Sequence, residues 1–139
     1  MEEICRHIVA KQTSSKSLVY GQRVFTCGHS FHFWVPDLLI DITNAAGIKD
    51  HCTVGVSFIG GSQAIQHWDV PGGQNEAKNA LRSGDVDVLT LSCMTQPDEG
   101  IRKFAKLAFE HNPDVRVTLQ ELWLPEDRFP FDPENRVRN

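Results

Sequence analysis

Long apolar runs are absent from this sequence. None approaches the roughly 18 residues that a membrane-spanning helix needs. The opening "MEEICRHIVAKQ" places acidic residues ahead of a very short uncharged stretch, unlike a secretory signal. The chain as given therefore predicts a cytoplasmic protein with no membrane partner. An export signal carried by a longer natural gene would lie outside it.

An excess of basic charge is also missing. The formal net charge is -4, which argues against a wide basic surface, so we expect no nucleic-acid partner. Neither a Gly-x-Gly-x-x-Gly fingerprint nor a Walker motif occurs, which argues against phosphate or nucleotide binding at a strand–helix junction. We expect no cofactor.

Cysteine is scarce and scattered. The four residues, with no Cys-x-x-Cys pair among them, are Cys5, Cys27, Cys52 and Cys93. This pattern fits neither a disulfide framework nor a zinc ribbon. We expect buried free thiols.

Short apolar segments alternate with amphipathic ones along a chain whose length predicts a single domain, 1–139. The predicted strands are residues 22–28, 52–61, 86–92 and 115–123, and the predicted helices are residues 35–47, 75–84 and 97–113. Residues 1–21 are expected to form an N-terminal helical extension, and the proline-broken residues 125–139 a polar tail.

Strands that alternate with helices indicate right-handed crossovers and a parallel sheet with helices on both faces. We therefore predict an α/β fold of the flavodoxin-like, three-layer type, with about four strands in the order 2-1-3-4. Ligands bind such sheets beyond the carboxyl ends of the strands. Ser30, Gly60, Gly61 and residues 92–96 all fall at those ends.

The segment "TCGHSFHFWVPDLL" places Ser30 between two histidines, where a predicted strand meets a predicted helix. The positive end of a helix dipole favours alkoxide and oxyanion character near the helix start. The N–H of Ser30 and an N–H of the glycine turn could converge on one oxygen, as an oxyanion hole requires. These features favour a nucleophilic serine for acyl transfer. The alternative is a serine that caps its helix beside turn glycines.

Three segments together resemble the SGNH (GDSL-like) hydrolases. "FTCGHSFHFWVPDLL" is similar to the Gly-x-Ser block, in the branch where that block reads Gly-His/Asn-Ser-Phe. "VSFIGGSQAIQHWD" is similar to the second block, a glycine turn followed by His-Trp, and "VDVLTLS" to the strand before the third block. The match runs from Gln22 to Pro125 in the family's order. It implies an SGNH-hydrolase-like fold that hydrolyses acyl esters.

The resemblance implies roles for single residues. Ser30 matches the nucleophile and, through its amide, one oxyanion donor, while Gly61, in preference to Gly60, matches the oxyanion glycine. The third block usually supplies an asparagine donor, but "SCMTQPDEG" has none, so Gln96 is preferred to Thr95 for that role. The implied substrate is a small-molecule or carbohydrate ester, including an acetyl group on a carbohydrate.

The family's last block, Asp-x-x-His, which supplies the general base, is absent. The chain stops before the expected fifth strand and resembles a truncated SGNH domain. His67 and His32 are the candidate bases, with His29 or a histidine of a neighbouring subunit as further alternatives. For each histidine the other interpretation is a polar surface residue or a hydrogen-bonded packing residue. An unassisted serine is a poor nucleophile, so the alternative function is a catalytically weak or inactive domain acting in binding or assembly.

Two further expectations concern side chains near this site. The candidate ligands for a divalent ion are His29 and His32 with Asp69 or His67. The His-x-x-His spacing is a weak signal by itself, so we expect no metal. Trp34 and Trp68 are expected to be buried structural residues, with an acyl or sugar pocket as the alternative.

Assembly is expected through the fourth predicted strand, residues 115–123. Without a fifth strand it would be a bare edge, and such an edge invites pairing with another chain. Its apolar residues are Val115, Val117, Leu119, Leu122 and Trp123. Because a self-complementary patch closes on itself in a two-fold dimer, we expect a homodimer or higher homo-oligomer built around this strand.

Overall fold

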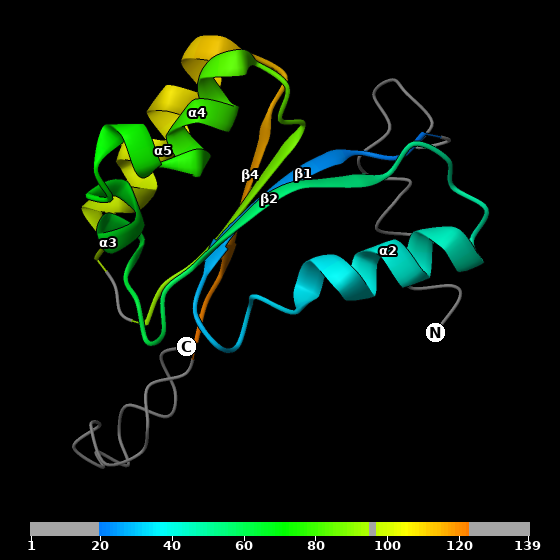
Figure 1. Cartoon of the computed structure of the whole chain (residues 1–139), viewed down its shortest axis with the longest axis horizontal. Coiled ribbons are helices and arrows are strands. Elements are labelled where there is room, and N and C mark those ends of the chain that lie inside the picture. Colours follow the sequence, from blue (N-terminus) through cyan, green and yellow to red (C-terminus); the bar gives the residue numbers. More distant parts are fainter. Residues whose placement is uncertain (1–19, 95–96, 123–139) are drawn as a thin grey trace, which may run out of the picture.

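The computed structural model describes residues 20–94 and 97–122. In chain order the elements are β1 (Arg23–Gly28), α2 (Val35–Ala45), β2 (Cys52–Phe58), α3 (Ala64–Trp68), the 3-10 helix η1 (Gly72–Gln74), α4 (Glu76–Ser83), β3 (Val88–Ser92), α5 (Glu99–His111) and β4 (Arg116–Gln120) (Figure 1). The expected polar tail and nearly all of the expected N-terminal extension lie outside the described residues. Within the described ranges, no helix combines the length and the apolar character that crossing a membrane requires.

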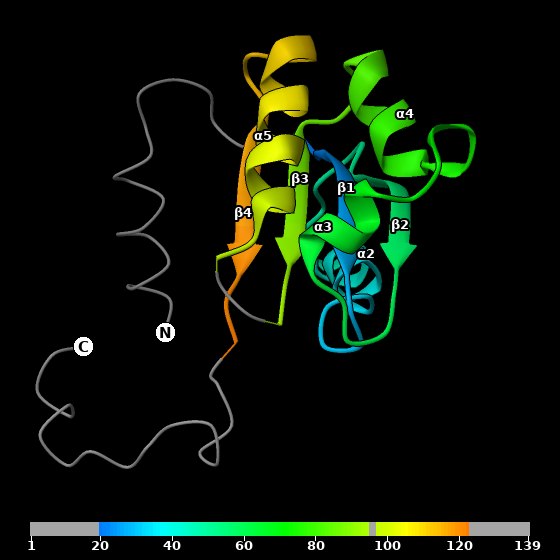
Figure 2. The same ribbon diagram turned by 90° about the vertical axis from the view of Figure 1, so that its left-hand side faces the viewer.

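The four strands are all parallel and lie in the order β2-β1-β3-β4, which confirms the predicted flavodoxin-like sheet. The step from β1 to β2 runs in one direction across the sheet, and the later steps run in the other. Right-handed crossovers therefore put α2 on one face and α3, α4 and α5 on the opposite face (Figures 1 and 2). In Figure 2 the sheet is seen from the side of α5, and α2 lies behind β1 and β2.

The face under α3, α4 and α5, here called the closed face, carries the hydrophobic core. Because strand side chains alternate between faces, Phe25 of β1 and Leu89 of β3 both point into it and are buried. Phe104 of α5 packs in the same cluster. Gly55 of β2 lets the sheet approach this cluster, since a Cβ at that position would lie 2.6 Å from Cε2 of Phe25.

The face under α2, here called the open face, is only partly covered. The exposed side chains of β2, from Val54 to Phe58 at every second position, lie on this side of the sheet. At β4 the side chains on the same face are polar and include Thr118. Among the described strands β4 is an edge strand, as expected, and Val115 and Val117 contact the core cluster on the closed side of the sheet.

Two expectations about burial are wrong in part. Cys27 and Cys93 are buried, as expected, and burial raises the pKa of Cys27 to about 12. Cys52, however, is exposed because it begins the edge strand β2; Cys5 lies outside the described residues. Trp68 is partly buried and packs edge-on against the Phe104 ring, with 5.1 Å between ring centroids, whereas Trp34 is exposed.

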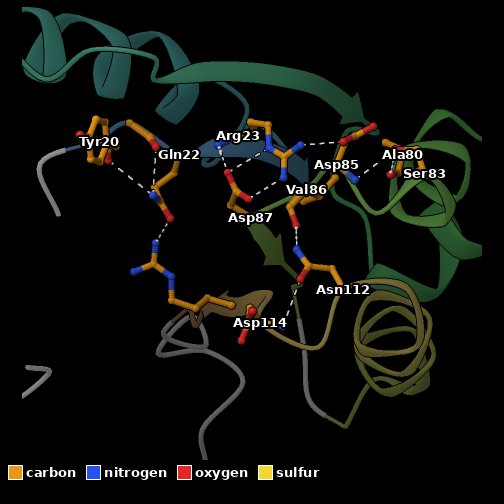
Figure 3. Close-up of polar contacts among 12 residues, drawn as sticks. Tyr20, Gln22, Arg23, Ala80, Ser83, Asp85, Val86, Asp87, Asn112 and Asp114 are labelled. Carbon is orange, nitrogen blue, oxygen red and sulfur yellow. Dashed lines mark hydrogen bonds and ion pairs between the residues drawn. The ribbon is translucent and has the colours of Figure 1, made fainter. Parts of the chain in front are cut away.

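Ion pairs join β1 to β3 at the amino ends of these strands (Figure 3). Arg23 contacts Asp85 Oδ1 through Nη1 at 2.7 Å and Asp87 Oδ1 through Nη2 at 2.8 Å. Its guanidinium lowers the pKa of the Asp87 carboxyl below the ordinary range. The side-chain amide of Asn112 donates to the carbonyl of Val86 at 2.8 Å, which ties the end of α5 to the start of β3. These contacts hold β1, β3 and α5 together at the amino ends of the strands.

Candidate functional site at the carboxyl ends of the strands

Ser30 lies in the turn that follows β1 and is exposed. Two hydrogen bonds to the carbonyl of His29 close this turn, from the N–H of His32 at 2.9 Å and from that of Phe33 at 3.1 Å. α2 begins only at Val35, and its cap carries no side-chain hydrogen bond. Ser30 therefore neither caps α2 nor lies in its first turn, which makes the alternative of a helix-capping serine wrong.

The glycine turn after β2 lies beside the end of β1, because the N–H of Ile59 donates to the carbonyl of Gly28 at 3.2 Å. Gly61 has a φ of 63°, a left-handed conformation that costs glycine little. Among residues 20–94 and 97–122, no atom lies within 4 Å of the place where a Cβ would sit on Gly60 or Gly61. The structure thus brings the glycine turn to the same end of the sheet as Ser30, the end at which the strands have their carboxyl ends.

The end of β3 joins the same edge. The N–H of Met94 donates to the carbonyl of Ser62 at 3.3 Å, directly after the glycine turn. The third predicted oxyanion donor, Gln96, and its alternative, Thr95, lie outside the described residues. β1 and β3 are neighbours in the sheet, and they lead to helices on opposite faces. Open α/β sheets bind ligands at the carboxyl ends of two such strands.

His67 is buried behind the glycine turn, between two serine hydroxyls. Its Nδ1 lies 2.7 Å from Ser57 Oγ, and its Nε2 lies 2.7 Å from Ser62 Oγ. Burial, together with a smaller effect of the nearby His29, lowers the pKa of His67 to about 4. The ring is therefore neutral at neutral pH, with one donor and one acceptor nitrogen. Both nitrogens have serine partners, and neither partner is Ser30.

His32 lies against the open face. Its Nδ1 is 2.7 Å from Gln120 Oε1, and its Nε2 is 2.7 Å from Thr90 Oγ1. A Cβ on Gly28 would lie 2.8 Å from Cβ and Cδ2 of His32, so a glycine at that position makes room for the ring. Desolvation lowers the pKa of His32. The ring connects the turn after β1 to β3 and β4, which is the role of a hydrogen-bonded packing residue.

His29 is fully buried, and a positive charge on its ring would lower the pKa of both His32 and His67. Its Nδ1 accepts the N–H of Phe31 at 3.3 Å, which assigns the ring proton to Nε2. Among the described residues Nε2 has no hydrogen-bond partner, and desolvation lowers the pKa of His29. No group of three or more His, Cys, Asp or Glu side chains in residues 20–94 and 97–122 is placed to hold a metal ion.

Asp98 is the residue at this edge whose full role the sequence did not indicate. Its carboxylate caps α5 through Oδ1, which accepts the N–H of Gly100 at 2.8 Å. The same carboxylate accepts the N–H groups of Ala64 at 2.5 Å and Ile65 at 3.0 Å, at the start of α3. Gly100 allows the two helices to meet, since a Cβ there would lie 2.2 Å from the Ile65 nitrogen. Only the cap on α5 has a sequence signal, the Pro-Asp-Glu before an amphipathic helix.

The arrangement combines an exposed serine with a preformed glycine turn. Within the part of the chain that the structure describes, no side-chain hydrogen bond links Ser30 to a histidine. Amide donors can stabilise an oxyanion at the carboxyl ends of these strands. No described histidine is hydrogen-bonded to Ser30, however, so none is in place to take its proton.

No family model, curated protein or solved structure matches this chain. The likeness to SGNH hydrolases therefore depends on the three sequence segments, and the fold assignment depends on the structure.

Proposed function

We propose that the protein is a serine ester hydrolase that removes acyl or acetyl groups from a small-molecule or carbohydrate ester, without a cofactor. Ser30 Oγ attacks the ester carbonyl carbon, and the amides of Ser30 and Gly61 bind the oxyanion with help from Gln96. The alcohol leaves, and water then hydrolyses the acyl-enzyme. Because no described histidine contacts Ser30, the serine proton passes to solvent and turnover is slow.

One observation carries this proposal. The hydrogen bond from Ile59 to Gly28 places the left-handed Gly61 turn next to the end of β1, and Ser30 lies two residues beyond that end. An oxyanion hole built from two backbone amides needs such a meeting of two loops at one edge. The glycine turn is held from behind as well, because Ser62 bonds to both His67 and Met94.

The test is incubation of the full chain with a fluorophosphonate probe, followed by mass mapping of the labelled peptide. We expect slow labelling at Ser30, loss of the label in Ser30→Ala, and aryl-acetate hydrolysis well below that of typical esterases. Ser62→Ala is the matched control, because Ser62 is the serine already bonded to a histidine. Undiminished labelling of Ser30→Ala, or labelling that disappears only in Ser62→Ala, would overturn the assignment to Ser30.

The second candidate function is a domain that binds or assembles without catalysis. It is favoured by the histidines: His29 and His67 are fully buried, His32 nearly so, and the hydrogen bonds of His32 and His67 go to residues other than Ser30. A complete lack of fluorophosphonate labelling in the folded chain is the result expected from this alternative, and it would reject the hydrolase proposal.

A further inference from the structure

The two edges of the sheet differ in how well they are protected against pairing with another chain. β2 has seven residues, "CTVGVSF", without a charged residue or a proline. β4 is shorter and carries Arg116, whose guanidinium bonds to Gln22. Soluble proteins protect edge strands with charge, proline, short length or a β-bulge. β2 has neither charge nor proline and is not short, although its pairing with β1 has one register irregularity, at Val54.

The open face beside β2 is apolar and exposed. Val54, Val56 and Phe58 are 40%, 36% and 53% exposed. Phe33, from the turn before α2, lies against Phe58 with 5.0 Å between ring centroids and is itself 47% exposed. The unprotected edge thus continues directly into an apolar surface.

α2 extends this surface. Trp34, Leu38 and Ile42 follow one another at four-residue spacing, and they are 48%, 48% and 53% exposed. This spacing places them along one side of the helix, while the fully buried residue of α2 is Pro36. An isolated surface helix would carry polar side chains on its outer side. The apolar outer side of α2 is instead typical of a helix that packs against a second surface as well as against its own sheet.

The size of the surface fits a specific partner. These seven residues, with their backbone atoms included, expose on the order of 700 Å² in all. The largest apolar patch on an ordinary monomer is roughly 300–600 Å², and each partner of a standard interface contributes about 800 Å². The surface is thus at or above the largest patch expected on a monomer and close to one side of a stable interface.

We propose that this surface joins two copies of the chain, with β2 pairing antiparallel to β2 of the second copy about a two-fold axis perpendicular to the sheet. The sequence around Gly55 suits such an axis, because Val54 and Val56 flank it symmetrically. The operation keeps α2 and its copy on the same face, so their apolar sides can meet. The four-stranded sheet becomes one continuous sheet of twice the width, and only the β4 strands remain as edges.

Sedimentation velocity of the full chain over a micromolar concentration range tests the proposal. We expect a species of twice the 15.6 kDa chain mass. Val54→Lys on β2 should weaken self-association at least about tenfold, because lysine on an edge opposes pairing. Thr118→Lys is the matched control, on the same face of the sheet but at the β4 edge, and it should leave the dimer unchanged.

Three results would overturn this interface: a wild-type chain that stays monomeric, a ladder of larger species in place of a dimer, or a dimer that Thr118→Lys breaks and Val54→Lys leaves intact. The last result would place assembly at β4, as the sequence alone predicts. If circular dichroism shows that Val54→Lys does not fold, Ile42→Lys on the exposed side of α2 gives the same readout. A dimer that survives Ile42→Lys then rejects the proposal.

Discussion

The two faces of this sheet are built from the same four strands and differ in what covers them. On the closed face, Phe25 and Leu89 are buried under α4 and α5 together with Phe104. On the open face, α2 lies over β1 and β2 and leaves Phe58 and its neighbours half exposed. Stability of the monomer should therefore come mainly from one face, while the other is available for contacts outside the chain.

The largest test of this difference compares two phenylalanines. Phe104→Ala should lower the free energy of unfolding by about 3–5 kcal/mol, because it opens a cavity among fully buried side chains. Phe58→Ala, on the open face, should cost about 1 kcal/mol or less, because half of that side chain already contacts solvent. Urea unfolding measures both, at a concentration below that of self-association. Equal losses would show that the two faces contribute alike.

Histidine titration extends the comparison to pH. The pKa of His67 is about 4 in the folded chain, against 6.5 without the fold. The unfolded chain thus takes up this proton first, and the stability present above pH 6.5 falls by on the order of 2–3 kcal/mol as the pH falls to 4. His67→Gln should remove most of this slope, as followed by urea unfolding between pH 4 and 7.

The open-face histidine gives the matched measurement. Desolvation lowers the pKa of His32 as well, but its hydrogen bond to Gln120 acts in the opposite direction. His32→Gln should therefore remove a smaller part of the slope than His67→Gln. A slope that is undiminished in His67→Gln, or that His32→Gln reduces more, would contradict the assignment of this proton uptake to the closed face.

The smallest expected difference lies at helix starts. Asp98→Ala should cost about 2 kcal/mol, because its carboxylate caps both α3 and α5 on the closed face. Asp37→Ala, in the first turn of α2, should cost only about 0.3 kcal/mol through the helix dipole. Thermal unfolding of the two variants measures the contrast. A loss for Asp37→Ala that equals the loss for Asp98→Ala would show that α2 depends on its first turn as much as the closed-face helices do.

Much of the fold follows from pattern, and the alternation of strands and helices is the clearest case. The apolar segments are separated by helices, and strands joined through a helix pair in parallel because right-handed crossovers leave few other topologies. α3 was not predicted, since five residues from Ala64 to Trp68 are too few to show a helical period. The exposure of Cys52 could not be read either, because neighbours in the sheet, and hence the edges, are set by tertiary packing.

The candidate site shows the same division between local and distant information. The sequence places Ser30 and the glycine turn at strand ends, and the structure brings those two loops to one edge. It does not indicate that His67 lies between Ser57 and Ser62, because that contact depends on how the chain turns back after β2. Nor does it indicate that Asp98 reaches α3, 34 residues earlier.

The reach of Asp98 also has a consequence for synthesis on the ribosome. A helix of five residues has little stability alone. α3 has a local capping box between Gln63 and Gln66, but the carboxylate that accepts the N–H groups of Ala64 and Ile65 lies 34 positions beyond Ala64. At about 5–20 residues per second, translation needs about 2–7 seconds to supply that carboxylate after Ala64 has been made. During that interval the nascent chain already contains Ser30 and the glycine turn, but Asp98 does not yet bind the start of α3, the helix that follows the glycine turn.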